Sequence, residues 1–312
     1  MSDTPSDPGA AGVPLFLRRC GYGPDDALSD LRRRGEIVPP EILGPAENAF
    51  LLTRYDDVRQ VLGDTQTFTN TADVTGGQAP ETTTEAAREG RLMRQDPPQH
   101  TRLRRMLAAE FTGRRVQRLA PRVTEVVEGR LDALEQAGPP AELVEQYCLP
   151  IPSLMICELL GVAYSDRAEF QERSRRMFDF AIAPDERAAL EADSERFMSA
   201  LVDAARADPG DDLLGMLIRE HGDELGHAEL VAVAGDLLVA GHETTANMIS
   251  MSILALLQHP EQLALVRDRP GAEARAVEEL LRWLCVVPIV LPRVAVADTA
   301  IRGVPVPSGS VM

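Results

Sequence analysis

The sequence predicts a mainly helical protein with a small β-region. From residue 98 to about residue 271, apolar residues recur at the spacing of one helix face, and glycine or proline interrupts the pattern. β-Branched or alternating runs occur near the two ends, at 49–53, 286–291 and 293–312. With 312 residues, of which 44% are hydrophobic, the chain can bury a substantial core.

The N-terminal elements alternate between helix, strand and loop. Residues 25–37 and 55–62 have helical periodicity, and 49–53 is typical of a short strand after a turn. Residues 67–90 are rich in Thr, Gly, Ala and Glu and predict a long, mobile loop. Such a loop can be a lid or a binding segment, and a disordered insertion is an equally open interpretation.

The central region is a series of helices whose predicted breaks are glycines and prolines. The breaks are Gly113, 138–140, 150–152, Pro184, 209–210 and 259–260. Beyond them, 293–312 alternates around glycines and prolines as in a hairpin. The last four residues are strand-like with no closing turn, which predicts an unfinished domain.

The charged residues exclude several classes of protein. The formal net charge of -17 disfavours general nucleic-acid binding, because a polyanion is repelled at long range. The chain contains no lysine, so all 32 basic residues are arginines. Schiff-base enzymes, pyridoxal-phosphate enzymes, Walker-type phosphate loops and protein kinases each need a lysine amine, and the sequence excludes them.

The cysteines and the N-terminus indicate a cytoplasmic protein. Cys20, Cys148, Cys157 and Cys285 form no C-x-x-C pair, which argues against a structural zinc site or a disulfide framework and fits a reducing compartment. Residues 1–12 are polar and lack the apolar segment of a secretory signal. We therefore expect residues 1–14 to be a flexible leader.

The longest periodic segment, 229–258, is apolar almost all round. This composition suits either a buried helix or a membrane span. Asp236, His242 and Glu243 lie inside the segment, and charged groups are costly in hydrocarbon. A central helix of a soluble protein is therefore favoured.

Residues 240–245, Ala-Gly-His-Glu-Thr-Thr, interrupt this helix. A glycine costs about 1 kcal/mol relative to alanine in a helix interior, and threonine hydroxyls can bond back to the preceding turn. A kink or a widened groove is the expected result. The spacing equally allows a solvated stripe on an uninterrupted helix. Polar residues recur there every seventh position, at Glu229, Asp236, Glu243 and Ser250.

A second cluster surrounds His100. Asp96 can cap a helix whose first position is Pro97, which places His100 and Arg104 one turn apart on one face. Two such groups could bind paired carboxylates or phosphates. From the pattern alone, an amphipathic surface helix is favoured instead, with Leu103 and its apolar neighbours facing inward.

The surrounding residues 91–122 are strongly basic. They contain nine arginines against Asp96 and Glu110, a local balance of 9 - 2 = +7 in an acidic chain. An acidic partner could dock there.

A third, weaker signal is Glu279 and Arg282, which stand three residues apart on a predicted helix and can pair.

Taken in order, these motifs resemble the bacterial cytochrome P450 monooxygenases over nearly the entire chain. The segment from Asp96 to Arg104 is similar to the C-helix motif of that family. Residues 240–245 resemble the oxygen-binding groove of its helix I, and Glu279-x-x-Arg282 resembles its helix K signature. The resemblance implies the cytochrome P450 fold, with one domain over 15–312.

The resemblance also implies haem b as cofactor and assigns roles to site residues. The cofactor-binding residues would be His100, Arg104, Ala240, Gly241 and Arg293. Charge-assisted hydrogen bonds explain why His and Arg suit haem propionates, and small residues would lie against the haem.

The remaining motif residues would be catalytic or structural. The resemblance implies that Glu243 and Thr244 relay protons during oxygen activation. It makes Glu279 and Arg282 structural. Residues 286–291 and the 67–90 loop would line the substrate pocket.

The chain departs from the family at the metal ligand. The family's Phe-x-x-Gly-x-x-x-Cys loop is absent from the sequence, and none of the four cysteines has that context. We therefore expect a fragment that is incomplete at the C-terminus, lacking the haem-thiolate loop and helix L. Without the thiolate the 312-residue chain alone is expected to be inactive.

The resulting hypothesis is a fragment of a monooxygenase. The complete protein would insert one oxygen atom of O2 into a small apolar substrate, using electrons from a ferredoxin-type donor and binding neither nucleic acid nor membrane. The alternative is a haem-less auxiliary protein of P450 type that activates a partner enzyme, which explains the missing cysteine directly. An all-helical interaction scaffold with coincidental motifs is a third interpretation.

Overall fold

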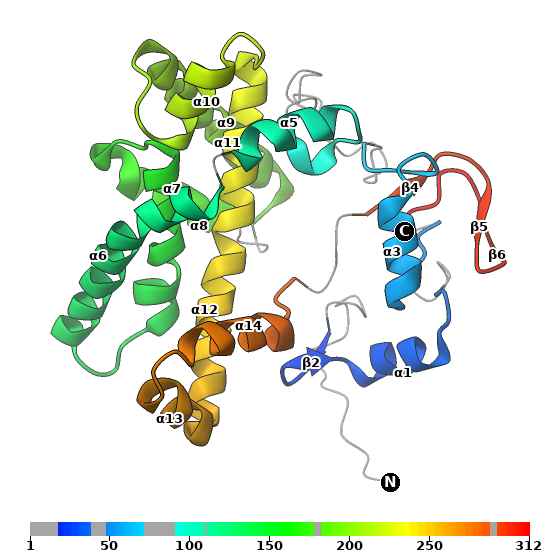
Figure 1. The fold of residues 1–312 in the computed structure, drawn as a ribbon, viewed down its shortest axis with the longest axis horizontal. Helices are drawn as coiled ribbons and strands as arrows, with labels where there is room; N and C mark the ends of the chain where they lie inside the picture. Colours follow the sequence, from blue (N-terminus) through cyan, green and yellow to red (C-terminus); the bar gives the residue numbers. More distant parts are fainter. Residues whose placement is uncertain (1–17, 39–47, 72–90, 110, 178–181, 288–291) are drawn as a thin grey trace. The chain divides into compact units, whose positions relative to one another are not determined.

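The computed structural model divides the chain into two compact units (Figure 1). Unit 1 comprises residues 1–78 and 273–312, and unit 2 comprises residues 79–272. The structure describes residues 18–38, 48–71, 91–109, 111–177, 182–287 and 292–312. The predicted leader, most of the predicted 67–90 loop and most of 286–291 lie outside the described residues. The single domain over 15–312 stays a prediction.

Unit 1 contains three described helices and three two-stranded antiparallel sheets. The helices are α1 (Asp26–Arg34), α3 (Tyr55–Gly63) and α14 (Glu273–Leu284). The strands are β1 (Arg19–Cys20), β2 (Gly23–Pro24), β3 (Phe68–Thr69), β4 (Val294–Ala295), β5 (Thr299–Ile301) and β6 (Val304–Val306). They pair as β1-β2, β3-β4 and β5-β6. The β3-β4 pairing joins residues from the two ends of the chain, Phe68 opposite Ala295.

The first predicted helix is confirmed, although it ends three residues early. The Asp25 carboxylate accepts the amide hydrogen of Ala27 at 2.8 Å and caps α1. Gly35 stops the helix because it takes the left-handed conformation, with φ 68°. The predicted strand at 49–53 is wrong as a continuous strand. Only two isolated bridges form there, at Ala49 and Leu51.

The predicted C-terminal hairpin is confirmed. β5 and β6 pair with Ile301 opposite Val304, and Gly303 makes the turn with φ 81°. Ile301 and Val306 are buried with Phe68 in the core of unit 1.

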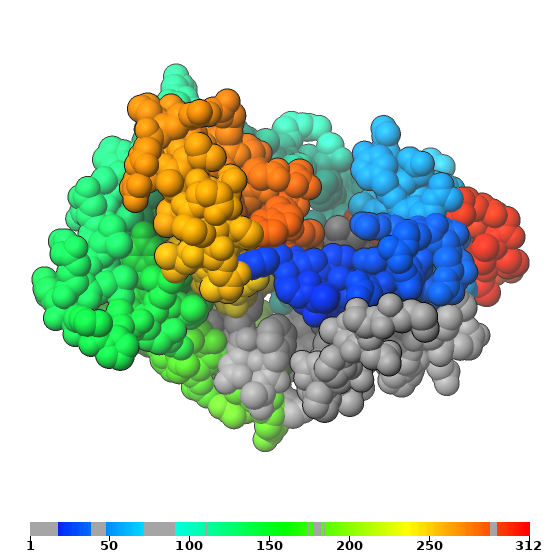
Figure 2. All heavy atoms as spheres, turned by 90° about the horizontal axis from the view of Figure 1, so that it is seen from below, coloured from blue at the N-terminus to red at the C-terminus, as the bar shows by residue number. Residues whose placement is uncertain are grey.

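The hairpin is also attached to α3 by an ion pair. The Arg302 guanidinium donates to the Asp57 carboxylate at 3.0 Å and to the carbonyl of Gly35. In Figures 1 and 2 the red hairpin accordingly lies beside the light blue α3. Asp57 is only 3% exposed, so its buried oxygens depend on this partner for hydrogen bonds.

Unit 2 is helical throughout its described residues. Its α-helices are α5 (Gln99–Ala108), α6 (Gly113–Ala137), α7 (Pro150–Leu160), α8 (Arg167–Met177), α9 (Pro184–Ala207), α10 (Leu213–His221), α11 (His227–Gly241), α12 (Glu243–Gln258) and α13 (Pro260–Asp268). Three shorter helical segments complete it: η3 (Leu92–Arg94), η4 (Val144–Cys148) and η5 (Tyr164–Asp166).

Most predicted breaks coincide with helix boundaries. α6 ends before Gly138, and α13 begins at Pro260 directly after the end of α12. At 150–152 the boundary lies at the first residue, because η4 ends at Cys148 and Pro150 occupies the first position of α7, where a missing amide hydrogen costs no helical bond. Gly113 and Pro184 likewise begin helices.

α11 forms the centre of the unit 2 core. Leu230, Ala234 and Leu238 on α11 are fully buried and pack in one cluster with side chains of α7 and α10 such as Leu160 and Leu217. Figure 1 shows α11 and α12 as successive yellow and gold helices with α9 and α10 beside α11. No helix in the described part of the chain is long and apolar enough to cross a membrane.

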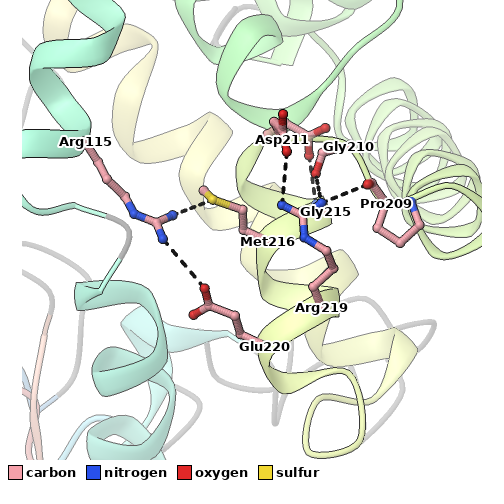
Figure 3. Close-up of polar contacts among 9 residues, drawn as sticks. Arg115, Pro209, Gly210, Asp211, Gly215, Met216, Arg219 and Glu220 are labelled. Carbon is pink, nitrogen blue, oxygen red and sulfur yellow. Dashed lines mark hydrogen bonds and ion pairs between the residues drawn. The ribbon is translucent and has the colours of Figure 1, made fainter.

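Arginines connect the helices of unit 2 (Figure 3). Arg115 of α6 pairs with Glu220 of α10 at 3.7 Å and also contacts the sulfur of Met216. Arg219 of α10 donates to the carbonyls of Pro209 and Gly210 and thereby holds the preceding loop. Because one guanidinium has five donors, it can join several groups at once.

Replacing Arg302 with Met should destabilise unit 1, because the buried Asp57 carboxylate loses its partner. We expect the free energy of unfolding to fall by about 2 kcal/mol. Chemical denaturation followed by circular dichroism measures this change. Arg33→Met, which removes an exposed pair with Asp30 in the same unit, is the matched control and should remain close to wild type. Equal effects of the two substitutions would contradict the prediction.

Candidate functional site

The central helix is interrupted where the sequence predicts it. α11 ends at Gly241 and α12 begins at Glu243, while His242 between them has φ -81° and ψ -72°. The Thr244 hydroxyl donates to the carbonyl of Ala240 at 2.7 Å, which is the predicted bond back to the preceding turn. The hydroxyl thus satisfies a carbonyl beside the break.

Glu243 and Thr244 are both half-buried, and each side chain bonds to a group four residues away along the chain. The Glu243 carboxylate accepts a hydrogen bond from the Asn247 amide at 3.0 Å, one turn further along α12. Each side chain therefore has one local partner and remains partly open. A carboxylate and a hydroxyl in adjacent positions can exchange protons with a bound molecule or with water. Their catalytic roles stay predictions.

Ala240 and Gly241 differ in what they face. Ala240 is exposed at the end of α11. A Cβ atom on Gly241 would lie 3.1 Å from Cδ1 of Ile156, so the glycine permits close packing of α11 against α7. Helix packing is thus one physical reason for Gly241, and its place against haem stays a prediction.

The polar residues of α11 do not form a solvated stripe. Glu229 pairs with Arg102 of α5 and accepts the amide hydrogen of Gly226 at 3.0 Å. The Asp236 carboxylate accepts the amide hydrogen of Met93 at 3.3 Å. Burial raises the pKa of Asp236, although the Met93 hydrogen bond opposes the rise. The solvated-stripe alternative is therefore wrong at these two positions.

His242, within the break, is 2% exposed. Burial lowers the pKa of its imidazole, while the neighbouring Glu243 carboxylate acts in the opposite direction. The imidazole is therefore favoured in its neutral form between the two helices.

The helix carrying His100 and Arg104 begins two residues later than predicted. α5 starts at Gln99, with Pro98 at the N-cap, so the prediction that Asp96 caps a helix beginning at Pro97 is wrong. The amide of His100 donates to the carbonyl of Asp96 at 3.0 Å, so a turn precedes the helix.

α5 is amphipathic, as the surface-helix interpretation predicts. Leu103, Met106 and Leu107 are buried in the unit 2 core. His100 is half-buried and Arg104 is exposed on the next turn. Among the described residues, no hydrogen bond or ion pair engages the Arg104 guanidinium. The Arg104 guanidinium is therefore available to an anion. The apolar face of α5 can pack in the core while its exposed face binds that anion.

The basic region at 91–122 is partly neutralised by unit 2 itself. Arg102 pairs with Glu229, and Arg115 pairs with Glu220. Arg122 donates to Glu158 at 2.7 Å, and this contact helps to lower the pKa of that carboxyl although burial acts against it. These three arginines bind helices together, so a docking partner would meet fewer free charges than the sequence count suggests.

The remaining predicted residues belong to unit 1. Arg293 donates to the Asn70 side chain at 2.9 Å and forms two backbone bonds with Met312. The predicted pair Glu279–Arg282 is confirmed on α14, with a separation of 2.6 Å. Both partners of that pair are exposed, so it adds little stability by itself.

Burial disfavours the thiolate form of two of the four cysteines. Cys148 and Cys157 are buried, and burial raises the pKa of the Cys157 thiol to about 12. The pKa of Cys148 is raised by the same cause. Cys20 and Cys285 are exposed. A thiolate ligand requires deprotonation, which the two buried positions oppose.

Sequence reasoning missed two asparagines that hold predicted site residues. Asn247 lies four residues after Glu243, and that helical spacing could have indicated the contact. Asn70 is 223 residues from Arg293, so no local pattern could have indicated it.

Comparison with known proteins gives consistent results. The family model described as Cytochrome P450 matches residues 194–268. Cytochrome P450 FAS1 of Rhodococcoides fascians is 45% identical, over 97% of this chain and 77% of that protein. Vitamin D3 dihydroxylase of Streptomyces griseolus is 38% identical, over 97% of this chain and 76% of that protein.

Solved structures that resemble this chain are also cytochromes P450. The P450 StaH from glycopeptide antibiotic A47934 biosynthesis superposes with a TM-score of 0.83 at 38% identity, covering 96% of this chain and 76% of that one. OxyE, a P450 involved in teicoplanin biosynthesis, has a TM-score of 0.85 at 32% identity, covering 96% of this chain and 77% of that one. The chain thus spans about three quarters of the length of these relatives.

Asp236→Asn should reduce the pH dependence of stability. The pKa of Asp236 is raised in the folded chain, so the folded state holds the proton more tightly than the unfolded state does. This contribution is fully present below the unfolded pKa and is lost as the pH rises through the folded pKa. Asn keeps the acceptor for Met93 without the charge. We therefore expect the variant to be more stable than wild type at neutral pH and the difference to shrink in acid, as measured by denaturant unfolding. A constant difference at all pH values would contradict this.

Thiol reactivity should divide the cysteines into two pairs. Cys20 and Cys285 are exposed and should react with Ellman's reagent in the native chain. Cys148 and Cys157 should react only after denaturation, because burial both shields them and keeps them protonated. Titration before and after adding guanidinium chloride measures this difference. Four thiols reacting in the native chain would show that the α7 region is open.

Proposed function

Because the chain belongs to the cytochrome P450 family, we propose that it is the larger part of a haem-thiolate monooxygenase with Glu243 and Thr244 as its proton-relay residues. Members of the family bind haem and use O2, a redox partner and an organic substrate. The observation that carries the proposal for the relay is the helix break at His242, which leaves the adjacent acid and hydroxyl partly open.

The donor set of the chain fits haem. Haem propionates are carboxylates, for which arginine and histidine are well-matched donors. Arg104 is exposed on α5, one turn from His100, and its guanidinium is not engaged by the described residues. Arg293 is half-buried beside Asn70. We propose that these three residues hold the propionates and that Ala240 and Gly241 leave room for the ring.

The bound haem supplies the oxygen-activating redox chemistry. The role of the protein is then to deliver protons and exclude excess water. Thr244 can turn its hydroxyl from the Ala240 carbonyl toward a bound molecule and donate a proton there. Glu243 can return a proton to Thr244 through water, because its carboxylate lies on the adjacent residue and is only half-buried.

We place the thiolate ligand in a segment outside these 312 residues. Burial raises the pKa of both buried cysteine thiols, and the sequence contains no Phe-x-x-Gly-x-x-x-Cys loop. The relatives are longer than this chain, which leaves room for such a segment. The haem-less auxiliary interpretation is not favoured, because the similarity extends over the whole chain to proteins named as oxygenating P450 enzymes.

The finer assignments belong to the same proposal. We propose a ferredoxin-type electron donor, whose acidic surface would complement Arg105, the exposed arginine of α5 that is not assigned to haem. A cytoplasmic location is supported by four free cysteines. A small apolar substrate fits the general character of enclosed ligand sites.

The complete reading frame tests the proposal directly. Protein expressed from it should bind haem, and the reduced form with carbon monoxide should show the Soret band of thiolate-ligated haem. Absence of haem or of that band would overturn the monooxygenase assignment and favour an auxiliary role. Sequence beyond Met312 with no cysteine loop would do the same.

Thr244→Ala should uncouple oxygen consumption from product formation in the complete protein. Removing the hydroxyl interrupts proton delivery, so we expect peroxide release to rise and product per O2 to fall by roughly tenfold. Oxygen-electrode and peroxide assays measure both quantities. Ser250→Ala is the matched control, because that hydroxyl makes the same bond to the carbonyl four residues earlier, at 2.8 Å. Unchanged coupling in Thr244→Ala would remove it from the relay.

Arg104→Ala should weaken haem retention in the complete protein without unfolding it. The substituted guanidinium is exposed, so its loss should affect the anion more than the fold. We expect lower haem content per chain and faster transfer of haem to apomyoglobin. Arg105→Ala, an exposed neighbour on the same helix, is the control and should retain haem. Wild-type haem content in Arg104→Ala would make α5 a surface helix only.

A further inference from the structure

A hollow of about 370 Å³ lies between α9 and α11 in unit 2. Its wall is mainly apolar, with Ala192, Ala228 and Val231 among its lining residues. Ser199 and His227 also line it and are both half-buried. The hollow involves none of the residues assigned above to haem or to proton transfer.

Ser199 and His227 at this hollow form a chain of contacts with Asp203, whose side chain is 71% exposed beside it. The Ser199 hydroxyl lies 2.9 Å from Nε2 of His227. Nδ1 of the same imidazole lies 3.4 Å from the Asp203 carboxylate. Ser199 and Asp203 stand four residues apart on α9, and His227 is the first residue of α11. In this chain of contacts Ser199 is the nucleophile, His227 the base and Asp203 the acid that orients the base. Serine hydrolases activate their serine with the same sequence of groups.

The position of Asp203 determines which ring nitrogen of His227 accepts a hydrogen bond. A carboxylate beside Nδ1 favours the tautomer with hydrogen on that nitrogen. Nε2 is then an acceptor, and the Ser199 hydroxyl is its donor. Because 3.4 Å is longer than an ordinary hydrogen bond, Asp203 acts mainly through its charge. The imidazole is thereby oriented to remove the Ser199 proton.

The start of α11 offers donors for a developing negative charge. The first helical bond of α11 runs from the amide of Leu230 to the carbonyl of Gly226, at 3.1 Å. The amides of His227 and Ala228 precede that bond at the positive end of the helix. Ala228 lines the hollow, as does the guanidinium-bearing Arg196. An oxyanion near Ser199 could accept from these amides, while Glu195 also lines the hollow and Arg196 pairs with Asp193 at 2.9 Å.

We propose that Ser199, His227 and Asp203 form a second reactive site, which hydrolyses small carboxylic esters through an acyl-serine. The Ser199 oxygen attacks the carbonyl carbon, and its proton passes to Nε2 of His227. The bond to the leaving alcohol oxygen breaks as the imidazolium returns that proton to it. Water then attacks the acyl-serine, His227 takes a proton from the water, and the carboxylic acid leaves as Ser199 is restored.

The dimensions and lining of the hollow select the substrate class. A volume of about 370 Å³ is at the small end of ligand sites. The alanine and valine wall suits a short apolar acyl chain, and Arg196 suits the polar carbonyl end. Esters of short-chain acids are therefore the expected substrates.

The 312-residue chain itself provides the test, with two probes. A fluorophosphonate should form one adduct per chain, at Ser199, as the P–F bond breaks and the bond from phosphorus to the serine oxygen forms. p-Nitrophenyl butyrate should release p-nitrophenolate, and peptide mass spectrometry of the quenched reaction should find the acyl group on Ser199. Circular dichroism of each variant establishes that it is folded.

Matched variants separate a reactive serine from a serine that only connects two helices. Ser199→Ala should abolish the adduct, and Asp203→Asn should slow labelling by on the order of 10²-fold while leaving α9 and α11 folded. Ser250→Ala, which removes a half-buried hydroxyl that bonds to the carbonyl of Ala246 and to the Cys148 thiol, far from the hollow in sequence, should label as wild type. No adduct at Ser199 in the folded wild type, or labelling unaffected by Asp203→Asn, would overturn the proposal.

Discussion

The burial of α11 is the constraint on which the rest of unit 2 depends. Where α11 packs against α7, α9 and α10, little surface is left for water, so polar side chains there are satisfied by partners in other elements. Glu229 meets Arg102, Asp236 meets the amide of Met93, and His227 meets Ser199. The same contacts that satisfy the polar groups also set the positions of α5, η3 and α9 around the central helix.

The break at His242 follows from that environment. A helix can end and restart in a buried setting only if the disturbed backbone groups are satisfied. The Thr244 hydroxyl satisfies the carbonyl of Ala240, and Gly241 allows the close approach of Ile156. The acid and hydroxyl at the start of α12 are therefore held near a packed core while remaining partly open.

The absence of lysine shapes how each unit is held together internally. A guanidinium can join several acceptors in one plane, which an ammonium group cannot do as precisely. Arg302 joins α3, the segment after α1 and the C-terminal hairpin, while Arg219 holds two successive carbonyls. Arginines that bind helices together are not available to a partner. This is why the basic region at 91–122 is less open than its composition implies.

The sequence by itself determined the helical class, most helix boundaries and the contacts within single helices. Apolar periodicity and helix-breaking residues report local geometry, so the Glu279–Arg282 pair and the Thr244 bond to Ala240 could be predicted. The order of three motifs was also sufficient for the family. Only the tertiary structure decided that Asn70 holds Arg293 and that Ser199 meets His227, since those contacts depend on packing between distant segments. No local pattern encodes which faces of two helices meet, because that choice is made by the whole core.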